Sequence, residues 1–133
     1  MARKRIGTII VPPGVFVEVH EKIVVDFLAV KIDYDITFLV PDRRKNAKTP
    51  DIEMDDLLWE IKSPKGKSSR TIENNLRSAL LQSPNIILDL RRIDGRVPTG
   101  RLLSEAERQF SLTKSMRHLI VITRQGDLID LER

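Results

Sequence analysis

The sequence predicts an α/β fold, a three-layer sandwich in which a mixed β-sheet lies between flanking helices. Apolar residues alternate with a period of two in some segments and recur at helical spacing in others, so both strands and helices are expected. Strand and helix segments follow one another along the chain, as they do in sheets with parallel pairs. Residues 85–90 and 117–123 have uninterrupted apolar centres, which is typical of strands covered on both faces.

The length of 133 residues predicts one domain over residues 1–133, with an N-terminal arm at 1–14 and a core at 18–131. The absence of cysteine excludes disulfides and thiolate metal sites, and His20 and His118 are too few for a histidine-rich zinc centre. Both histidines are expected to be structural. Apolar runs are too short for a membrane span or a signal peptide, so a cytoplasmic site of action is expected.

The N-terminal third is expected to form an arm, a helix and a strand. Residues 9–11 are apolar enough for a short strand, and a Pro-Pro-Gly sequence ends it. A helix is predicted for residues 18–30 and a strand for residues 36–40, with a turn at 33–35 between them. The apolar residues at helical spacing in that helix are Ile23, Phe27 and Val30, with Val24 and Leu28 beside them.

A polar loop over residues 41–49 leads into the most informative segment, a predicted hairpin over residues 50–62. Asp55 and Asp56 are its tip, because two-residue loops are the commonest hairpin connections. The pairs that follow from this tip are Met54 with Leu57, Ile52 with Trp59, and Asp51 with Glu60.

This register sorts the hairpin residues onto two faces, because strand side chains alternate. The face expected to join the core is apolar and carries Ile52, Met54, Leu57, Trp59 and Ile61. The other face carries Asp51, Glu53, Leu58, Glu60 and Lys62. Opposed like charges destabilise a sheet, so Asp51 and Glu60 require a cation. A divalent metal ion with Lys62 beside it meets that requirement.

The second half of the chain alternates helices and strands. A Gly-containing polar loop at residues 65–70 follows the hairpin, and loop residues are also expected at 96–100. Residues 85–90, 104–112 and 117–123 form a strand–helix–strand crossover if the two strands are parallel. The elements predicted here are helix 71–82, strand 85–90, helix 104–112, strand 117–123, a turn at 124–127 and strand 128–131.

Pro50-Asp51 followed by Glu60-Ile61-Lys62 resembles the signature of the PD-(D/E)XK nuclease superfamily. The segments WEIKSPKG, RTIENNLRSALLQSPNIILDLRR and RHLIVITRQGDLIDL are similar to the C-terminal tRNA nuclease toxin domains of contact-dependent growth inhibition (CdiA-like) proteins. This resemblance implies a PD-(D/E)XK nuclease-like core and a phosphodiesterase site. It also raises an immunity protein as a partner, although no residue of the sequence requires one.

The chemistry expected of this site is metal-dependent hydrolysis, because a divalent ion offsets phosphate charge and activates water. Mg²⁺ is the favoured cofactor, with Mn²⁺ or Zn²⁺ as alternatives, and it binds through one or two carboxylates. Asp51 and Glu60 are the predicted ligands, and the resemblance adds the Ile61 carbonyl. Lys62 is expected to hold a phosphate oxygen or position water, or to act as a base. The resemblance also implies an acidic residue from the first helix, for which Glu21 is the candidate and Glu18 the reserve.

Basic loops flank the carboxylates on both sides, which would draw a polyanion toward the metal. A solvated basic surface is the alternative interpretation. A polar stripe on the following helix, with Thr71 and Asn75, is placed beside them, and it too could be merely solvent-facing. The residues predicted to contact nucleic acid are Arg43, Arg44, Lys45, Lys48, Ser63, Lys65, Lys67, Arg70, Thr71 and Asn75.

The function expected from these observations is a metal-dependent endonuclease acting on RNA, with tRNA favoured by the resemblance. The first alternative is a DNA endonuclease or junction resolvase with the same core. The second is a catalytically silent domain that binds nucleic acid or a partner protein. The chain is expected to be a monomer or a weak dimer without a membrane partner.

Overall fold

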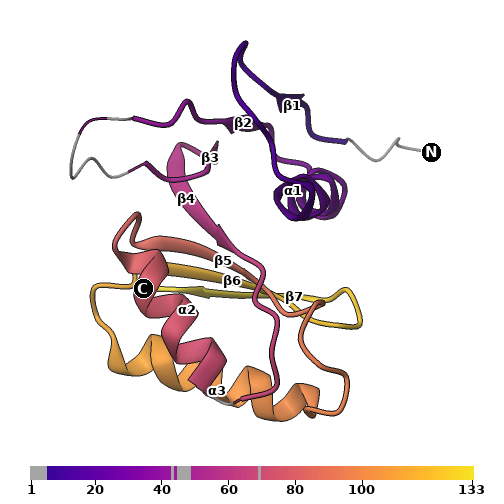
Figure 1. Cartoon of the computed structure of the whole chain (residues 1–133), viewed down its shortest axis with the longest axis vertical. Helices are drawn as coiled ribbons and strands as arrows, with labels where there is room; N and C mark the ends of the chain where they lie inside the picture. Colours follow the sequence, from indigo (N-terminus) through magenta and orange to yellow (C-terminus); the bar gives the residue numbers. More distant parts are fainter. Residues whose placement is uncertain (1–5, 43, 45–48, 69) are drawn as a thin grey trace.

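The computed structural model describes residues 6–42, 44, 49–68 and 70–133. Its centre is a seven-stranded sheet in the order β1-β2-β3-β4-β5-β6-β7, accompanied by three helices (Figure 1). The sheet is mixed, since β1–β2, β4–β5 and β5–β6 are parallel and the other neighbouring pairs are antiparallel. The predicted α/β fold class is confirmed.

The elements follow the predicted order. The strands are β1 Ile9–Ile10, β2 Ile36–Phe38, β3 Ile52–Met54, β4 Leu57–Lys62, β5 Asn85–Asp89, β6 His118–Ile122 and β7 Leu128–Glu132. The helices are α1 Val19–Lys31, α2 Arg70–Leu80 and α3 Thr99–Leu112. The predicted crossover exists, because α3 connects the parallel strands β5 and β6.

Two apolar cores lie on opposite faces of the sheet, which makes three layers. Helix α1 covers one face, and α2 and α3 cover the other (Figure 1). Strands β5 and β6 supply both cores, because alternate residues point to opposite faces: Ile87 packs on the α1 side and Ile86 on the α2 side. The prediction that these two strands are covered on both faces is confirmed.

The β3–β4 hairpin has the predicted tip and register. Asp55 and Asp56 both have positive φ, +53° and +61°, as a type I′ turn requires. Met54 pairs with Leu57 and Ile52 with Trp59. The Trp59 indole is buried and donates to the Met54 carbonyl at 2.9 Å. Trp59 therefore belongs to the core and offers no stacking surface to a nucleic acid, as expected.

One residue of the predicted apolar face is misplaced. Leu57 is 37% exposed, whereas Ile52, Met54, Trp59 and Ile61 are buried. Leu57 follows the tip directly and lines a cavity there, so part of its side chain stays in contact with water.

The buried stripe of α1 also differs from the prediction. Ile23 and Val30 are half exposed, and the residues facing the sheet are Val24, Val25, Leu28 and Ala29. The segment IVVDFLAV is apolar almost all round, so its periodicity does not determine which side packs. Packing against β2, β3 and β4 decides the rotation of the helix.

Helix α3 begins five positions before the predicted start, at Thr99 instead of Ser104. The predicted capping pattern at Ser104 is therefore inside the helix. Pro98 is the N-cap, and its carbonyl accepts from the Arg101 amide at 3.1 Å. The extra turn buries Leu102 against the α2–α3 core, which outweighs the local preference of Ser104. Smaller differences occur at β2, which ends at Phe38, and at α2, which ends at Leu80.

None of the helices in the described part of the chain is long and apolar enough to cross a membrane.

The hairpin tip generates a stability prediction. Asp56 occupies a left-handed conformation that glycine adopts without a Cβ penalty. Replacing Asp56 with Gly is expected to raise the free energy of unfolding by about 0.5–1 kcal/mol. Asp56→Ala, which keeps a Cβ and lacks the aspartate's tolerance of this region, is expected to lower it. Urea denaturation of the three proteins measures both changes. Equal midpoints would mean that the left-handed conformation of Asp56 does not affect the stability of the fold.

Candidate active site

The predicted catalytic residues converge where α1, β3 and β4 meet. Glu21 lies in the first turn of α1, and Asp51 directly precedes β3. Glu60 and Lys62 lie on β4, in register with Ile86 and Leu88 of β5. Residues paired in a sheet point to the same face, so Glu60 and Lys62 face the α2 side, whereas Trp59 faces α1.

Strand β4 changes partner at this point. Leu57–Trp59 pair with β3, and Glu60–Lys62 pair with β5. The predicted backbone pair of Asp51 with Glu60 is therefore missing, because the antiparallel register ends at Ile52–Trp59. The Asp51 amide donates to the Trp59 carbonyl instead, at 2.9 Å.

The side chain of Asp51 is anchored by the backbone of β4. Its Oδ2 accepts a hydrogen bond from the Ile61 amide at 2.8 Å. The Asp51 carboxylate is also within hydrogen-bonding reach of the Glu21 and Glu60 carboxyl groups. The predicted proximity of Asp51 and Glu60 is confirmed in this way, and Glu21 joins them as a third carboxylate.

Glu60 is buried, with 8% of its surface exposed. Burial, then repulsion and a shared proton with Asp51, raise its pKa to about 8, although Lys62 opposes the shift. Burial and the same two effects of Asp51 raise the pKa of Glu21 to about 7. Three carboxyl groups thus share a site that is short of positive charge.

The donor set fits a divalent cation. Lys62 Nζ lies 3.7 Å from Glu60 Oε2, while Glu60 Oε1 is buried without a hydrogen-bond partner among the residues that the structure describes. Buried polar atoms rarely lack a partner, and carboxylate oxygens are the ligands that Mg²⁺ prefers. Asp51, Glu60 and Glu21 could hold such an ion. The Ile61 amide donates to Asp51, and the Ile61 carbonyl stays a predicted metal ligand.

The structure adds two residues to the edge of this cluster. Glu18, the reserve candidate, accepts from His20 Nε2 across 3.1 Å. One ligand atom from each of Glu18, His20 and Glu21 lies within 4.8 Å of the others. His20 was expected to be structural, but it is half-buried beside the carboxylates. The spacing E-x-H-E across the start of a helix was the signal in the sequence.

The basic residues that follow β4 are exposed, and their predicted contact with nucleic acid stays a prediction. Lys65, Lys67 and Arg70 are exposed in the loop between Lys62 and α2 and at the start of that helix. Arg44, on the other flank, is exposed but paired with Asp42 across 2.6 Å, so part of its charge is already neutralised. The predicted contacts Arg43, Lys45 and Lys48 lie outside the described residues.

The polar residues of the predicted contact set differ in their availability. Ser63 Oγ is buried without a hydrogen-bond partner in the described part of the chain. The Asn75 side chain donates to the Thr71 carbonyl at 2.8 Å, so one of its donors is used within α2. Both Thr71 and Asn75 are half-buried.

Arg92 was missed by sequence reasoning. It is exposed, and its Nη1 donates to the Ser63 carbonyl at 3.0 Å. Arg92 follows β5 and Ser63 follows β4, and the carboxyl ends of these parallel strands meet at one edge of the sheet. Because functional residues often lie beyond the carboxyl ends of parallel strands, the position of Arg92 after β5 was the available signal in the sequence. Its neighbour Arg91 pairs with Asp89 and lies over the Phe27 ring, which makes it structural.

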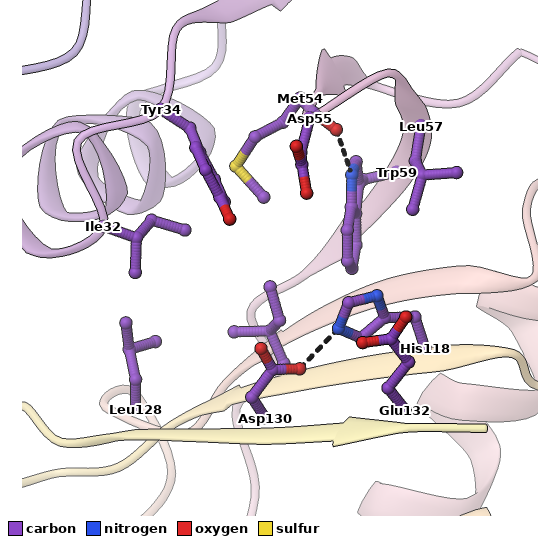
Figure 2. A pocket seen from close by; sticks show the side chains of 11 residues that line it. Ile32, Tyr34, Met54, Asp55, Leu57, Trp59, His118, Leu128, Asp130 and Glu132 are labelled. Carbon is purple, nitrogen blue, oxygen red and sulfur yellow. Dashed lines mark hydrogen bonds and ion pairs between the residues drawn. The ribbon is translucent and has the colours of Figure 1, made fainter.

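A cavity of about 200 Å³ lies near the hairpin tip, and none of the clustered carboxylates lines it. Figure 2 shows Tyr34, Met54 and Trp59 around this space, with His118 below Trp59. His118 is buried, bonds Asp130 through Nε2 and packs at 4.7 Å on the Trp59 ring. The structural role expected for His118 agrees with this packing. This cavity is therefore separate from the candidate site at Glu60.

Comparisons with known proteins identify a family and a shared fold. Residues 48–128 match the family described as "Contact-dependent growth inhibition CdiA C-terminal domain". A chain of the solved CdiA-CT/CdiI toxin and immunity complex from Burkholderia pseudomallei is similar, with a TM-score of 0.65 and 17% identity. The match covers 96% of this chain and 100% of the other, and at this identity it shows a shared fold. No curated protein sequence matches this chain.

The raised pKa values generate a prediction about pH and metal binding. Glu21 and Glu60 have pKa values of about 7 and about 8 in the folded protein, against an ordinary value of 4.5. The folded state therefore holds these protons more tightly than the unfolded chain does. The resulting stability is complete below the ordinary pKa and is lost as the pH rises through about 8.

Thermal denaturation without metal is expected to show a Tm that falls as the pH rises from about 5 to about 8. Glu60→Gln, which removes the most strongly shifted carboxyl group, should reduce this fall. Added Mg²⁺ should raise the Tm of the unmodified protein more at the higher pH, because ligands must be deprotonated. An equal effect of Mg²⁺ on the Glu60→Gln variant would show that the ion binds at another site.

Proposed function

Because this chain belongs to the contact-dependent growth inhibition CdiA C-terminal domain family, we propose that it is a metal-dependent endonuclease with a PD-(D/E)XK-type site. The observation that carries the proposal is the convergence of Glu21, Asp51 and Glu60 beside Lys62, with one buried Glu60 oxygen lacking a donor in the described chain. RNA is the proposed substrate, and tRNA is favoured by the similarity of WEIKSPKG and the segments after it to tRNA-cleaving toxin domains.

Each residue has a distinct role in this proposal. A bound divalent ion would supply charge neutralisation at the phosphate and lower the pKa of a water molecule. Asp51 and Glu60 would hold the ion, with Glu21 completing the acidic set. The Ile61 amide keeps Asp51 in place. Lys62 lies beside Glu60, and its ammonium group would donate to a non-bridging phosphate oxygen.

The surroundings support a polyanionic substrate. Lys65, Lys67, Arg70 and Arg92 lie on the segments that follow β4 and β5, at the edge toward which Lys62 is placed. A duplex DNA substrate and a silent binding domain are the competing functions. Intact Asp51, Glu60 and Lys62 favour catalysis over silent binding.

An inhibitory partner is part of the same proposal. The structurally similar Burkholderia pseudomallei chain comes from a complex of a toxin with an immunity protein. We propose that a producing cell protects its cytoplasm from this nuclease with a corresponding immunity protein. A nuclease that acts as a monomer or weak dimer leaves its surface available for such a partner.

The first test concerns catalysis. Glu60→Gln, Asp51→Asn and Lys62→Met are each expected to lower the cleavage rate of total tRNA in Mg²⁺ by at least a hundredfold, on the order of losing one major electrostatic contribution. EDTA should abolish cleavage by the unmodified protein. Denaturing gels of total RNA and agarose gels of plasmid DNA measure both substrates.

Glu53→Gln is the matched control, because Glu53 is an exposed carboxylate of the same hairpin and pairs with Leu58. It should leave the rate unchanged. Cleavage that survives in the Glu60→Gln protein would move the active site away from the hairpin. Cleavage of DNA alone would replace the RNA assignment and leave the site intact.

The second test concerns the basic loop. Reversing Lys65 and Lys67 together to Glu should weaken tRNA binding and flatten its salt dependence, by roughly 0.7–0.9 in log–log slope for each phosphate that the loop no longer neutralises. Fluorescence anisotropy with the Glu60→Gln protein at several salt concentrations measures this without cleavage.

Lys114→Glu with Arg117→Glu is the control for the same change in net charge. Both residues are exposed before β6, at the opposite end of the parallel strands from Lys65 and Lys67. Equal losses of affinity from the two double reversals would indicate a general effect of net charge, and the loop would then be only a solvated surface.

A further inference from the structure

Phe16 is the most exposed of the described large hydrophobic residues, with 85% of its surface in contact with solvent. It lies in the segment between β1 and α1, where Val15 and Val17 pack against the α1-side core. In an extended segment, alternate side chains point to opposite sides, so anchoring Val15 and Val17 directs Phe16 outward. The backbone itself presents this ring to solvent.

A pocket of about 200 Å³ connects Phe16 with the carboxylate cluster. Its apolar walls come from three parts of the chain and include Val15, Phe38, Leu39 and Pro41. Glu21 and Asp51 line the same pocket, so a group bound there lies next to the proposed metal ligands. Glu18 is also part of the lining and adds a carboxylate that can accept hydrogen bonds.

The shape and chemistry of this pocket fit a nucleobase. An apolar cavity of about 150 Å³ admits a benzene ring, so there is room for a flat heteroaromatic ring. Bases stack on exposed aromatic side chains regardless of their sequence, because each base has a π-face. A carboxylate such as that of Glu18 can accept from the amino group of adenine, cytosine or guanine. A paired base in a duplex could not enter, since its partner and its stacked neighbours occupy both sides.

We propose that Phe16 and this pocket bind the base of an unstacked nucleotide beside the scissile phosphate, so that cleavage occurs in single-stranded or looped segments. The inference rests on the proposed nuclease function and names its substrate class. It assigns to Phe16 a role in substrate specificity that is separate from the hydrolytic step. Phe16 positions the nucleotide, while Asp51, Glu60 and Lys62 act on the phosphate.

Binding of two RNA probes tests the proposal without cleavage. One is a synthetic hairpin with a single-stranded loop, and the other is a blunt duplex of equal length. In the Glu60→Gln protein with Mg²⁺, Phe16→Ala should weaken hairpin binding by roughly fivefold to a hundredfold, the range for removal of one base–aromatic stack. Duplex binding should not change. Phe16→Trp should bind the hairpin as well as the parent, because it keeps the aromatic face.

Leu112→Ala is the matched control, since Leu112 is a similarly exposed apolar residue at the end of α3 and should have no effect. In the cleavage-competent protein, Phe16→Ala should raise KM for the hairpin more than it lowers kcat. An abasic residue in the hairpin loop should weaken binding to the parent by the same factor and weaken binding to the Phe16→Ala variant no further.

The outcomes separate this inference from the proposed function. Suppose that Glu60→Gln abolishes cleavage and Phe16→Ala leaves hairpin binding unchanged. The proposal that Phe16 and the pocket bind a base is then wrong, and the proposed nuclease function is retained. If Phe16→Ala weakens hairpin and duplex equally, the ring contacts the backbone in general and the inference is overturned. If the unmodified protein cleaves neither RNA nor DNA with any divalent ion, the proposed nuclease function is wrong. The base-binding role of the pocket, which rests on that function, is then overturned with it.

Discussion

Strand β4 changes partner between Trp59 and Glu60, and the whole candidate site depends on that change. Up to Trp59 its neighbour is β3, and from Glu60 its neighbour is β5. The antiparallel ladder therefore stops one residue short of Asp51, and the Ile61 amide donates to the Asp51 side chain instead of to a β3 carbonyl. A continuous ladder would have used these backbone groups for sheet pairing. A third carboxylate, Glu21 of α1, lies within reach of Asp51 at the same place.

Holding three carboxylates together costs free energy, and packing of the surrounding apolar residues offsets that cost. Both faces of the central strands are covered, and the buried residues beside the cluster, such as Trp59 and Ile61, are fixed in the α1-side core. This packing keeps Glu60 in place although burial and Asp51 disfavour its charged form. If a cation binds as proposed, the site is preorganised for it, because the carboxyl groups are already held together before any ion binds.

Two kinds of surface surround the cluster, and the proposed function gives each a different part in binding a substrate. The proposal assigns phosphate contacts to the cationic side chains after β4 and β5, whose positions follow from the shared edge of two parallel strands. Phe16 belongs to the segment before α1, and the pocket beside it combines apolar walls with the carboxylates of Glu21 and Asp51. In the proposed function, charge would provide affinity for a polyanion, and the pocket would select one nucleotide next to the scissile phosphate.

The sequence by itself determined the hairpin, since a two-residue tip and a period of two are local properties that place Glu60 and Lys62 on one face and Trp59 on the other. It also determined the helix–strand order and the buried character of β5 and β6. Only the tertiary structure decided the rotation of α1, because its apolar residues surround the helix and packing selects the side that faces the sheet. The same holds for His20, Arg92 and Phe16. Their neighbours are brought close by the folded chain, so the sequence held at most a weak signal for these contacts, such as the E-x-H-E spacing at His20.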